Sequence, residues 1–279
     1  MISNARMYCV TSEVTDHWKR LLESVIGAAG CAMTYLDYPP SAPIDGLWAR
    51  GDLGAVMMCG LPFSQRVPQP QIVAAPVPAY GTEPRKAEYW SEFVCRRDSG
   101  FDTLESSFGS RIALTTHGSQ SGYFAALQHL SAYRRRAPLF RELIAPVYTP
   151  QGAVSAVVSG RADLAPVDCY SLALMRQYQP DMIADLVVIS QTEPRPIPCL
   201  VASGAPDPLL QNSLLSAHTQ PHLRELLDQL LLERFVLPSA KSYRVLDLEA
   251  VRTRNSFPLR ELATLIDPYY LSLPERDVV

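Results

Sequence analysis

The chain has 279 residues and a formal net charge of −3 at pH 7, a length that predicts one large domain or two moderate ones. Because 47% of the residues are hydrophobic, the chain can bury a substantial core, which excludes a disordered or collagen-like protein. The near-neutral charge argues against nucleic-acid binding, which normally needs a basic face. Arg134, Arg135 and Arg136 form the main basic cluster, and their place after an apolar helical stretch predicts a solvated helix end.

The six cysteines form no CxxC pair and have no histidine at zinc-ligand spacing, so we expect no metal site and no cofactor. Most lie in apolar runs such as Val56-Met57-Met58-Cys59, which predicts reduced core thiols and suits a reducing compartment. The N-terminus lacks a secretory-signal pattern, and no stretch approaches the roughly 20 apolar residues of a membrane span. We therefore expect a cytoplasmic protein, or a periplasmic one if a signal peptide has been removed.

Strand-like and helix-like segments alternate along the chain, which favours an α/β fold with a largely parallel sheet. The expected strands are 7–10, 32–36, 54–59, 72–75, 92–96, 111–115, 144–148, 163–167 and 186–190. The expected helices are 16–29, a short one near 103–105, then 123–134, 151–159 and 223–235. Proline enrichment predicts extended chain over 64–86, and Gly60-Leu61-Pro62 predicts a loop after the third strand.

Two extended, proline-marked crossings bound the middle of the chain, the second at Glu193-Pro194-Arg195-Pro196. This arrangement predicts two α/β lobes. Lobe 1 is expected to be discontinuous, with residues 1–89 and 196–279, and lobe 2 to be inserted over residues 90–195. Two crossing strands would join them.

A polar turn, Gly118-Ser119-Gln120-Ser121-Gly122, separates an expected strand from an expected helix. A helix start leaves about four backbone N–H groups without intrahelical partners, and its dipole favours an anion. The serine hydroxyls could donate to an oxyanion, and the glycines allow close backbone approach. The alternative is an ordinary helix cap, since serine and glycine are common there. The turn lacks the lysine of a P-loop and does not fit GxGxxG, which argues against nucleotide binding.

Asp168 is expected at the C-terminal end of a buried strand, the edge at which open α/β sheets bind ligands. Its carboxylate could accept a hydrogen bond from a ligand ammonium or from a protonated oxygen of an oxyanion. It could also cap the following helix, and the two roles are compatible. No GxSxG elbow or carboxylate pair is present, and His117 is a lone loop histidine, so we predict no catalytic residue.

The middle of the chain resembles the phosphate/phosphonate-type substrate-binding proteins of ABC transporters. The matching residues run from Val94-Cys95-Arg96-Arg97-Asp98-Ser99-Gly100 through Gly109-Ser110-Arg111-Ile112-Ala113 and Ser119-Gln120-Ser121-Gly122-Tyr123 to Gly160-Arg161-Ala162-Asp163 and Val167-Asp168. The resemblance covers roughly residues 54–215. It implies the periplasmic-binding-protein type II fold, in which two α/β lobes close over a ligand.

The resemblance also implies a set of ligand-binding residues. Ser119, Gln120 and Ser121, with Gly122 completing the turn, would hold the phosphate or phosphonate oxygens, and Asp168 would lie opposite. In the first lobe the loop that holds Leu61 and Phe63 occupies the place of a family ligand loop. Phe63 stands where tyrosine is common, and Gln151 would stand in for a ligand-binding histidine.

The expected function is capture of a small oxyanion, with an ABC permease or a regulatory protein as partner. One alternative is a cytosolic enzyme on the same fold that acts on a small carboxylated substrate, as menaquinone-pathway enzymes do. His117 or Asp168 would then be the base. Another is a cytosolic sensor that passes its closure to a partner, for which the apolar segment Leu223 to Phe235 could offer a surface. Fold alone does not decide among them.

Overall fold

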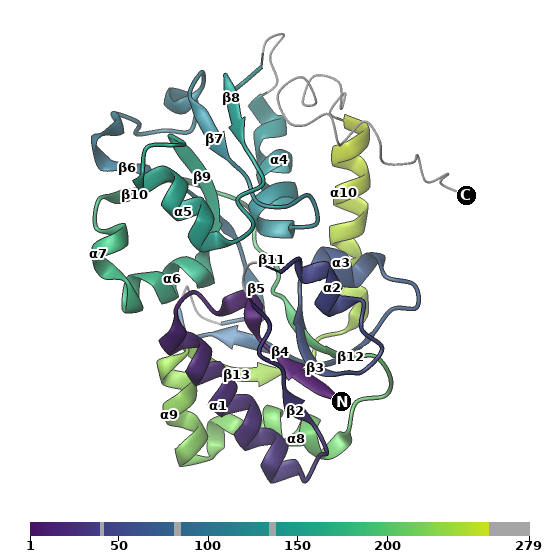
Figure 1. Cartoon of the computed structure of the whole chain (residues 1–279). Helices are drawn as coiled ribbons and strands as arrows, with labels where there is room; N and C mark the ends of the chain where they lie inside the picture. Colours follow the sequence, from purple (N-terminus) through teal and green to yellow (C-terminus); the bar gives the residue numbers. More distant parts are fainter. Residues whose placement is uncertain (40–41, 81–84, 134–137, 257–279) are drawn as a thin grey trace. The chain divides into compact units, whose positions relative to one another are not determined.

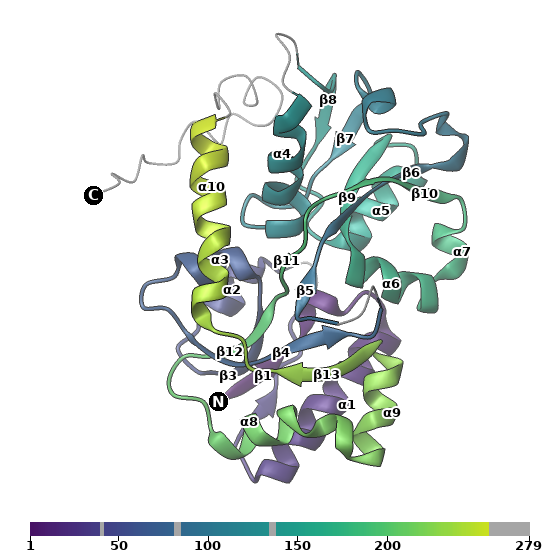
Figure 2. The ribbon, with the colours of Figure 1, turned by 180° about the vertical axis from the view of Figure 1, so that it is seen from behind.

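The structure is a computed structural model that describes residues 1–39, 42–80, 85–133 and 138–256 (Figures 1 and 2). The chain divides into two compact α/β units, each with its own large sheet, which confirms the expected two-lobed fold. Unit 1 comprises Met1–Tyr89, Cys169–Met182 and Pro194–Asp247, and unit 2 comprises Trp90–Asp168, Ile183–Glu193 and the chain from Leu248. The arginine cluster 134–136 and the expected end of the helix over 123–134 lie outside the described residues.

Unit 1 is built on a six-stranded sheet with the order β13-β4-β12-β3-β1-β2. Its strands are β1 (Ile2–Asn4), β2 (Thr34–Tyr35), β3 (Leu53–Met58), β4 (Gln71–Pro78), β12 (Cys199–Ala202) and β13 (Leu232–Val236). A separate pair joins β5 (Glu88–Tyr89) and β11 (Arg195–Pro196). β1 runs parallel to β2 and β3, whereas β12 and β13 are antiparallel to their neighbours. The sheet is therefore mixed rather than largely parallel, because the chain returns to it late.

The helices α1, α8 and α9 lie side by side on one face of this sheet (Figures 1 and 2). The helices that belong wholly to unit 1 are η1 (Arg6–Tyr8), α1 (Ser12–Ala29), α2 (Ile44–Trp48), α3 (Gly60–Gln65), α6 (Cys169–Tyr178), α8 (Pro208–Leu215), η6 (Ala217–Thr219), α9 (Pro221–Gln229) and η7 (Ala240–Tyr243). In α1 the fully buried Trp18 and Leu22 share the core face. Thr11 caps its start and Gly30, at φ 65°, ends it.

The segment 169–182, which the sequence places in the inserted lobe, instead clusters with unit 1. The side chains of α6 supply the reason. The Tyr170 hydroxyl donates to the Leu230 carbonyl at 2.7 Å, and the Tyr170 ring packs edge-on against Tyr8 with 4.6 Å between centroids. These buried aromatic contacts attach α6 to the core of unit 1.

Unit 2 is built on a five-stranded sheet with the order β10-β6-β9-β7-β8. Its strands are β6 (Ser91–Arg96), β7 (Arg111–Ala113), β8 (Glu142–Ile144), β9 (Leu164–Asp168) and β10 (Leu186–Gln191). β7 runs parallel to β8 and β9, and β6 is antiparallel to both of its neighbours. The carboxyl ends of β7, β8 and β9 therefore lie at one edge of the sheet.

The helical elements of unit 2 are mostly short. They are η2 (Arg97–Ser99), η3 (Glu105–Ser107), the π-helical turn η4 (Gln120–Phe124), α4 (Ala125–Leu130), η5 (Ser131–Tyr133) and α5 (Pro150–Val158). Two further helices, α7 (Pro180–Ile183) and α10 (Arg244–Ser256), contain residues of both units. Within the described residues, no helix has the length and apolar character needed to cross a membrane.

Two expected elements near the start of the chain are wrong. The strand over 7–10 is a 3-10 turn, because the Asn4 side chain accepts the Arg6 N–H at 2.8 Å and turns the chain after β1. The loop at Gly60-Leu61-Pro62 is the start of α3, where Phe63 N–H donates to the Cys59 carbonyl at 3.0 Å. A proline is tolerated in the first turn of a helix, since the N–H it lacks has no intrahelical acceptor there.

The expected helix over 223–235 is also wrong in its second half. Helix α9 ends at Gln229, and Leu231 takes a positive φ of 53°. The following Leu232–Val236 pairs antiparallel with β4 as β13. Leucine-rich sequence continues through this break, so its pattern resembles one helix, and pairing with a distant strand overrides the local preference.

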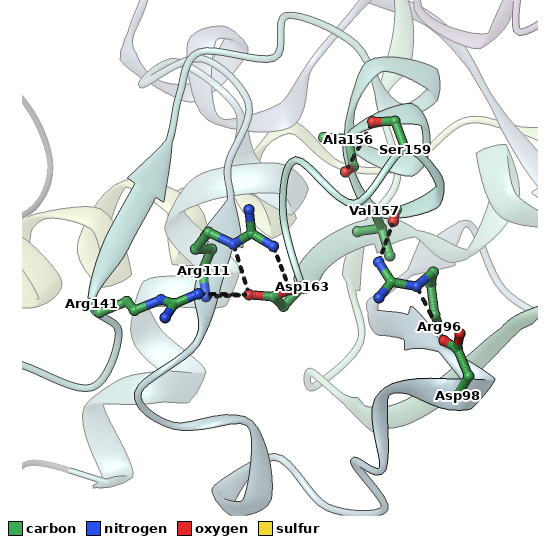
Figure 3. Close-up of polar contacts among 8 residues, drawn as sticks. All are labelled: Arg96, Asp98, Arg111, Arg141, Ala156, Val157, Ser159 and Asp163. Carbon is green, nitrogen blue, oxygen red and sulfur yellow. Dashed lines mark hydrogen bonds and ion pairs between the residues drawn. The ribbon is translucent and has the colours of Figure 1, made fainter.

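An ion pair joins β7 and β9 at the sheet edge opposite their carboxyl ends (Figure 3). The Arg111 guanidinium donates to both oxygens of the Asp163 carboxylate, at 2.9 and 2.8 Å, and the Arg111 backbone N–H donates to it at 2.9 Å. A second cation, Arg141, lies 4.0 Å away. Hydrogen bonds from Arg111 lower the pKa of Asp163 below its usual value, so the carboxylate is charged at neutral pH.

A second arginine on the same unit makes weaker contacts (Figure 3). Arg96 donates to the exposed Asp98 carboxylate at 3.1 Å and to the Val157 carbonyl at 3.3 Å, near the end of α5. Ser159 closes that helix end by donating to the Ala156 carbonyl at 3.3 Å. Water competes for the hydrogen bonds of the exposed Arg96–Asp98 pair, so this pair should contribute little to stability. The Arg96–Asp98 pair is therefore a suitable control for the Arg111–Asp163 pair.

The helix that follows β7 approaches the end of that strand closely at Gly122. The Thr115 backbone N–H donates to the Gly122 carbonyl at 3.1 Å. A Cβ atom added at Gly122 would clash with the Thr115 hydroxyl oxygen and lie 2.7 Å from its Cγ2 atom. At Gly118, in the same turn, an added Cβ meets nothing within 4 Å. Glycine is therefore required at 122 by packing, whereas 118 has room for a side chain.

We predict that Asp163→Asn lowers the free energy of unfolding at pH 7 by about 2 kcal/mol, because charged hydrogen bonds are lost. The folded-state pKa of Asp163 is depressed, so its contribution exists above the unfolded value of about 3.9 and disappears as pH falls through the folded value. Urea unfolding between pH 7 and pH 3 should show the deficit shrinking in that acid range. Asp98→Asn should stay close to wild type, and equal losses in both variants would contradict this account.

We predict that Gly122→Ala lowers the melting temperature and Gly118→Ala does not, since the added methyl group clashes at one site alone. Overpacking typically costs about 1–3 kcal/mol. Thermal unfolding of both variants tests the difference. A Thr115→Ala change added to Gly122→Ala should recover part of the loss, because it removes the atoms that the new methyl meets. A double variant no more stable than Gly122→Ala would rule out Thr115 as the cause.

Candidate functional site

Three of the sequence-predicted site segments meet at the carboxyl edge of the unit 2 sheet. The turn Ser119–Gly122 follows β7, Gln151 lies in the helix after β8, and Asp168 is the last residue of β9. Because β7 lies between β8 and β9, the turn lies between the other two positions. The fold thus brings together residues that are up to 49 positions apart, counting from Ser119 to Asp168. Ligands commonly bind at such an edge.

Ser119 begins the helix after β7 and caps it. Its hydroxyl oxygen accepts the Gly122 N–H at 3.1 Å, and its carbonyl accepts the Phe124 N–H at 3.1 Å, a π-helical spacing. The capping role that the sequence offered as an alternative is therefore present. The helix supplies no acceptor for the N–H groups of its first residues, so the start carries partial positive charge. A cap and an anion site can share this turn.

The other two polar side chains of the turn differ in burial. Gln120 is 2% exposed, so the whole residue is buried. Ser121 is half-buried, and its carbonyl accepts the Ser91 hydroxyl at 2.8 Å. Ligand contact by the Gln120 side chain stays a prediction, as does contact by the Ser121 hydroxyl.

Ser91 connects the turn to Asp168, a link that the sequence analysis missed. Ser91 pairs directly with Asp168 across β6 and β9, while its hydroxyl reaches Ser121. The Thr192 hydroxyl accepts the Ser91 N–H at 2.9 Å and fixes this end of β6. Asp168 is 4% exposed, so its carboxyl group lies buried beside the turn. The sequence gives no sign of this role, because Ser91 is a single serine directly before the expected strand over 92–96.

Gln151 lies in the first turn of α5, which Thr149 caps. The Thr149 hydroxyl accepts the Gly152 N–H at 2.9 Å, and Pro150 takes the first helical position. Gln151 is half-buried. Its position fits the predicted role, and its contact with a ligand stays a prediction.

Leu61 and Phe63 belong to unit 1 and lie in its core. Their side chains are 1% and 0% exposed, and the Phe63 ring packs edge-on against Tyr243 with 5.0 Å between centroids. The structure therefore gives both side chains a packing role. Ligand contact at these two positions stays a prediction.

His117, the candidate base of the enzymatic alternative, packs against a buried ring. Its imidazole lies edge-on to Tyr123, with 4.9 Å between centroids and Tyr123 1% exposed.

Within the described parts of the chain, no group of three or more metal-ligating side chains is close enough to hold a metal ion. All six cysteines are free thiols, and burial raises the pKa of Cys199 to about 12.

The sequence of residues 42–243 matches the family described as the periplasmic substrate-binding protein of phosphonate ABC transporters. No curated protein matches the chain. Among solved structures, a binding-protein component of an ABC phosphonate transporter from Pseudomonas aeruginosa is 17% identical, with a TM-score of 0.73 over 95% of this chain and 92% of that one. PhnD1 from Prochlorococcus marinus MIT 9301, solved with methylphosphonate, is 16% identical, with a TM-score of 0.75 over 92% and 98%.

The fold is also shared with more distant binding domains. The glutamate-bound GluR0 ligand-binding core from Nostoc punctiforme has a TM-score of 0.52 at 13% identity, covering 82% of this chain and 96% of that one. At such identities the structural likeness establishes the fold, and the family follows from the sequence match, which spans most of the chain and all of the unit 2 strands. The chain belongs to the family of periplasmic substrate-binding proteins of phosphonate ABC transporters.

Proposed function

We propose that this chain captures a small phosphorus oxyanion, a phosphonate or phosphate, and delivers it unchanged to an ABC permease. The solute-binding role follows from the family, whose members are periplasmic binding proteins. The observation that supports the ligand class is the meeting of a capped helix start with a buried carboxyl group at one sheet edge. A periplasmic site of action and a permease partner are part of the proposal.

The helix start at Ser119 supplies the attraction for the anion. Backbone N–H groups and the helix dipole point at the space beyond the turn, and no lysine or arginine lies within Thr115–Tyr123. Binding to neutral donors of this kind depends on short, well-aligned hydrogen bonds. The Thr115–Gly122 packing and the Ser91–Ser121 hydrogen bond hold these donors in place.

Asp168 selects among anions in this proposal. A carboxylate beside an oxyanion repels it unless the ligand carries a proton that the carboxylate can accept. A monoprotonated phosphonate or phosphate has such a P–OH group, and an aminophosphonate has an ammonium group as well. Sulfate has neither at neutral pH. We therefore expect phosphorus oxyanions to bind in preference to sulfate.

A thermal-shift screen against methylphosphonate, phosphate, aminoethylphosphonate, sulfate and small carboxylates tests the ligand class. A ligand at about 100 times its Kd should stabilise the protein by about 2.7 kcal/mol. We predict a shift with phosphorus oxyanions and none with sulfate, and phosphorus NMR should show the ligand chemically intact after incubation. A response to carboxylates alone, or turnover of any of these compounds, would contradict the proposal.

We predict that Ser121→Ala weakens methylphosphonate binding about tenfold and Asp168→Asn by about 10- to 100-fold, since charged hydrogen bonds contribute about 1.5–3 kcal/mol. Isothermal titration calorimetry measures both. Ser159→Ala, which changes a serine at the end of α5 that is bonded to its own helix, is the control and should bind as wild type does. Unchanged affinity in both site variants would place the ligand elsewhere.

The pH dependence of binding tests the role of Asp168 separately. Wild-type affinity for methylphosphonate should fall as the pH rises through the second ionisation of that ligand, because the shared proton is then lost. Asp168→Asn removes the charge that repels the dianion, so its affinity should vary less over the same range. Parallel pH profiles for the two proteins would exclude a shared proton.

A further inference from the structure

Tyr148 is an exposed aromatic residue in a backbone conformation that side chains rarely adopt. It lies in the loop between β8 and α5, is 69% exposed and has a φ of 53°. Among the described residues, Leu231 is the other non-glycine residue with a positive φ. It lies beside the paired strands β4 and β13, and its carbonyl accepts the Ala79 N–H at 2.7 Å. Pairing of β13 with β4 explains the positive φ of Leu231. Packing does not explain the positive φ of Tyr148, because its side chain is exposed. Such outliers gather at ligand sites.

The backbone around Tyr148 is held on both sides. Thr149 N–H donates to the Val147 carbonyl at 2.6 Å across Tyr148, which makes a tight three-residue turn. Val147 N–H donates to the Leu114 carbonyl at 3.1 Å. At Gly152 an added Cβ would clash with the Val147 carbonyl, so the helix start is pressed against this turn. The surroundings therefore impose the conformation of Tyr148 and aim its ring outward.

The Tyr148 turn adjoins the candidate anion site within unit 2. Leu114, which accepts the Val147 N–H, continues β7 and leads to Ser119 five residues later. Neighbouring strands lie about 4.8 Å apart, so the chain after β8 and the turn after β7 run past each other at the same edge. The exposed Tyr148 side chain therefore extends from the same sheet edge at which the turn lies.

We propose that Tyr148 is a specificity residue that contacts the organic substituent of the ligand. This inference rests on the proposed function, because it assumes that the oxyanion occupies the Ser119–Gly122 turn. The aromatic ring of Tyr148 offers an apolar face on which a planar substituent can stack. The site then prefers a phosphorus oxyanion whose substituent is planar or ring-bearing over one with a methyl group. The ligand that this proposal predicts is a phosphonate or a phosphate monoester with an aryl group or another ring as its substituent.

The test compares phenylphosphonate with methylphosphonate by titration calorimetry on the full chain. Tyr148→Gly removes the ring while glycine accepts the positive φ, so the turn is preserved, and its melting temperature should equal or exceed that of wild type. Tyr148→Phe keeps the ring, and Val158→Ala trims another exposed side chain of unit 2, 43% exposed, as a matched control.

Wild type should bind phenylphosphonate more tightly than methylphosphonate, and Tyr148→Gly should weaken phenylphosphonate alone, by about fivefold. Tyr148→Phe and Val158→Ala should retain the wild-type ratio of the two Kd values. Equal losses for both ligands in Tyr148→Gly, or no loss, would overturn the inference while the proposed function stood. Wild-type binding of methylphosphonate but not phenylphosphonate would also overturn it. Failure of wild type to bind any phosphorus oxyanion would remove the proposed function itself.

Discussion

The contact between Thr115 and Gly122 is the constraint on which the arrangement of the candidate site depends. The chain must turn from β7 into a helix within a few residues, and the helix start can come close to the strand end where no side chain intervenes. That close approach directs the first N–H groups of the helix beyond the sheet edge. It also brings Ser121 within hydrogen-bonding reach of Ser91, and hence next to Asp168.

The two edges of the unit 2 sheet have different physical roles. At the amino edge of β7 and β9, Arg111 and Asp163 satisfy each other with several charged hydrogen bonds. At the carboxyl edge, Asp168 is buried beside donors that carry no formal charge. Both aspartates belong to the sequence stretch that resembles the family, and they lie at opposite edges of the same sheet.

The parts of the fold that could be predicted from sequence are those where local pattern and tertiary demand agree. The apolar face of the helix over 16–29 and the continuous apolar run over 54–59 each correspond to one element, α1 and β3. The prediction of one helix over 223–235 was wrong because the second half of the segment pairs with β4. A local sequence pattern contains no information about such a distant partner strand. The turn at Ser119 was predictable, since strand, small polar residues and helix follow in order.

What the sequence could not show about the site is how deeply each residue is buried, which strand it pairs with and which backbone conformation it adopts. Gln120 has the polarity of a binding residue, and the sequence pattern does not predict that it is only 2% exposed in the π-helical turn. Ser91 is unremarkable in sequence and gains its role from the register between β6 and β9. Tyr148 needs a positive φ, a property that amino-acid pattern predicts for glycine and not for tyrosine.

In our proposal, features shared with the family therefore constrain the oxyanion end of the ligand more than its organic substituent. In our proposal the turn after β7 and Asp168 at the end of β9 bind an oxyanion that carries a proton, and both lie within the family match. The turn after β8 lies within the family match too, and in our proposal its exposed Tyr148 contacts the substituent of the ligand. At 16–17% identity to the solved phosphonate-binding structures, the shared fold can preserve the first feature while the second changes. Because the Tyr148 side chain is exposed, exchanging it costs the packed core little, so in our proposal ligand choice is set by a residue that leaves the sheet unaltered.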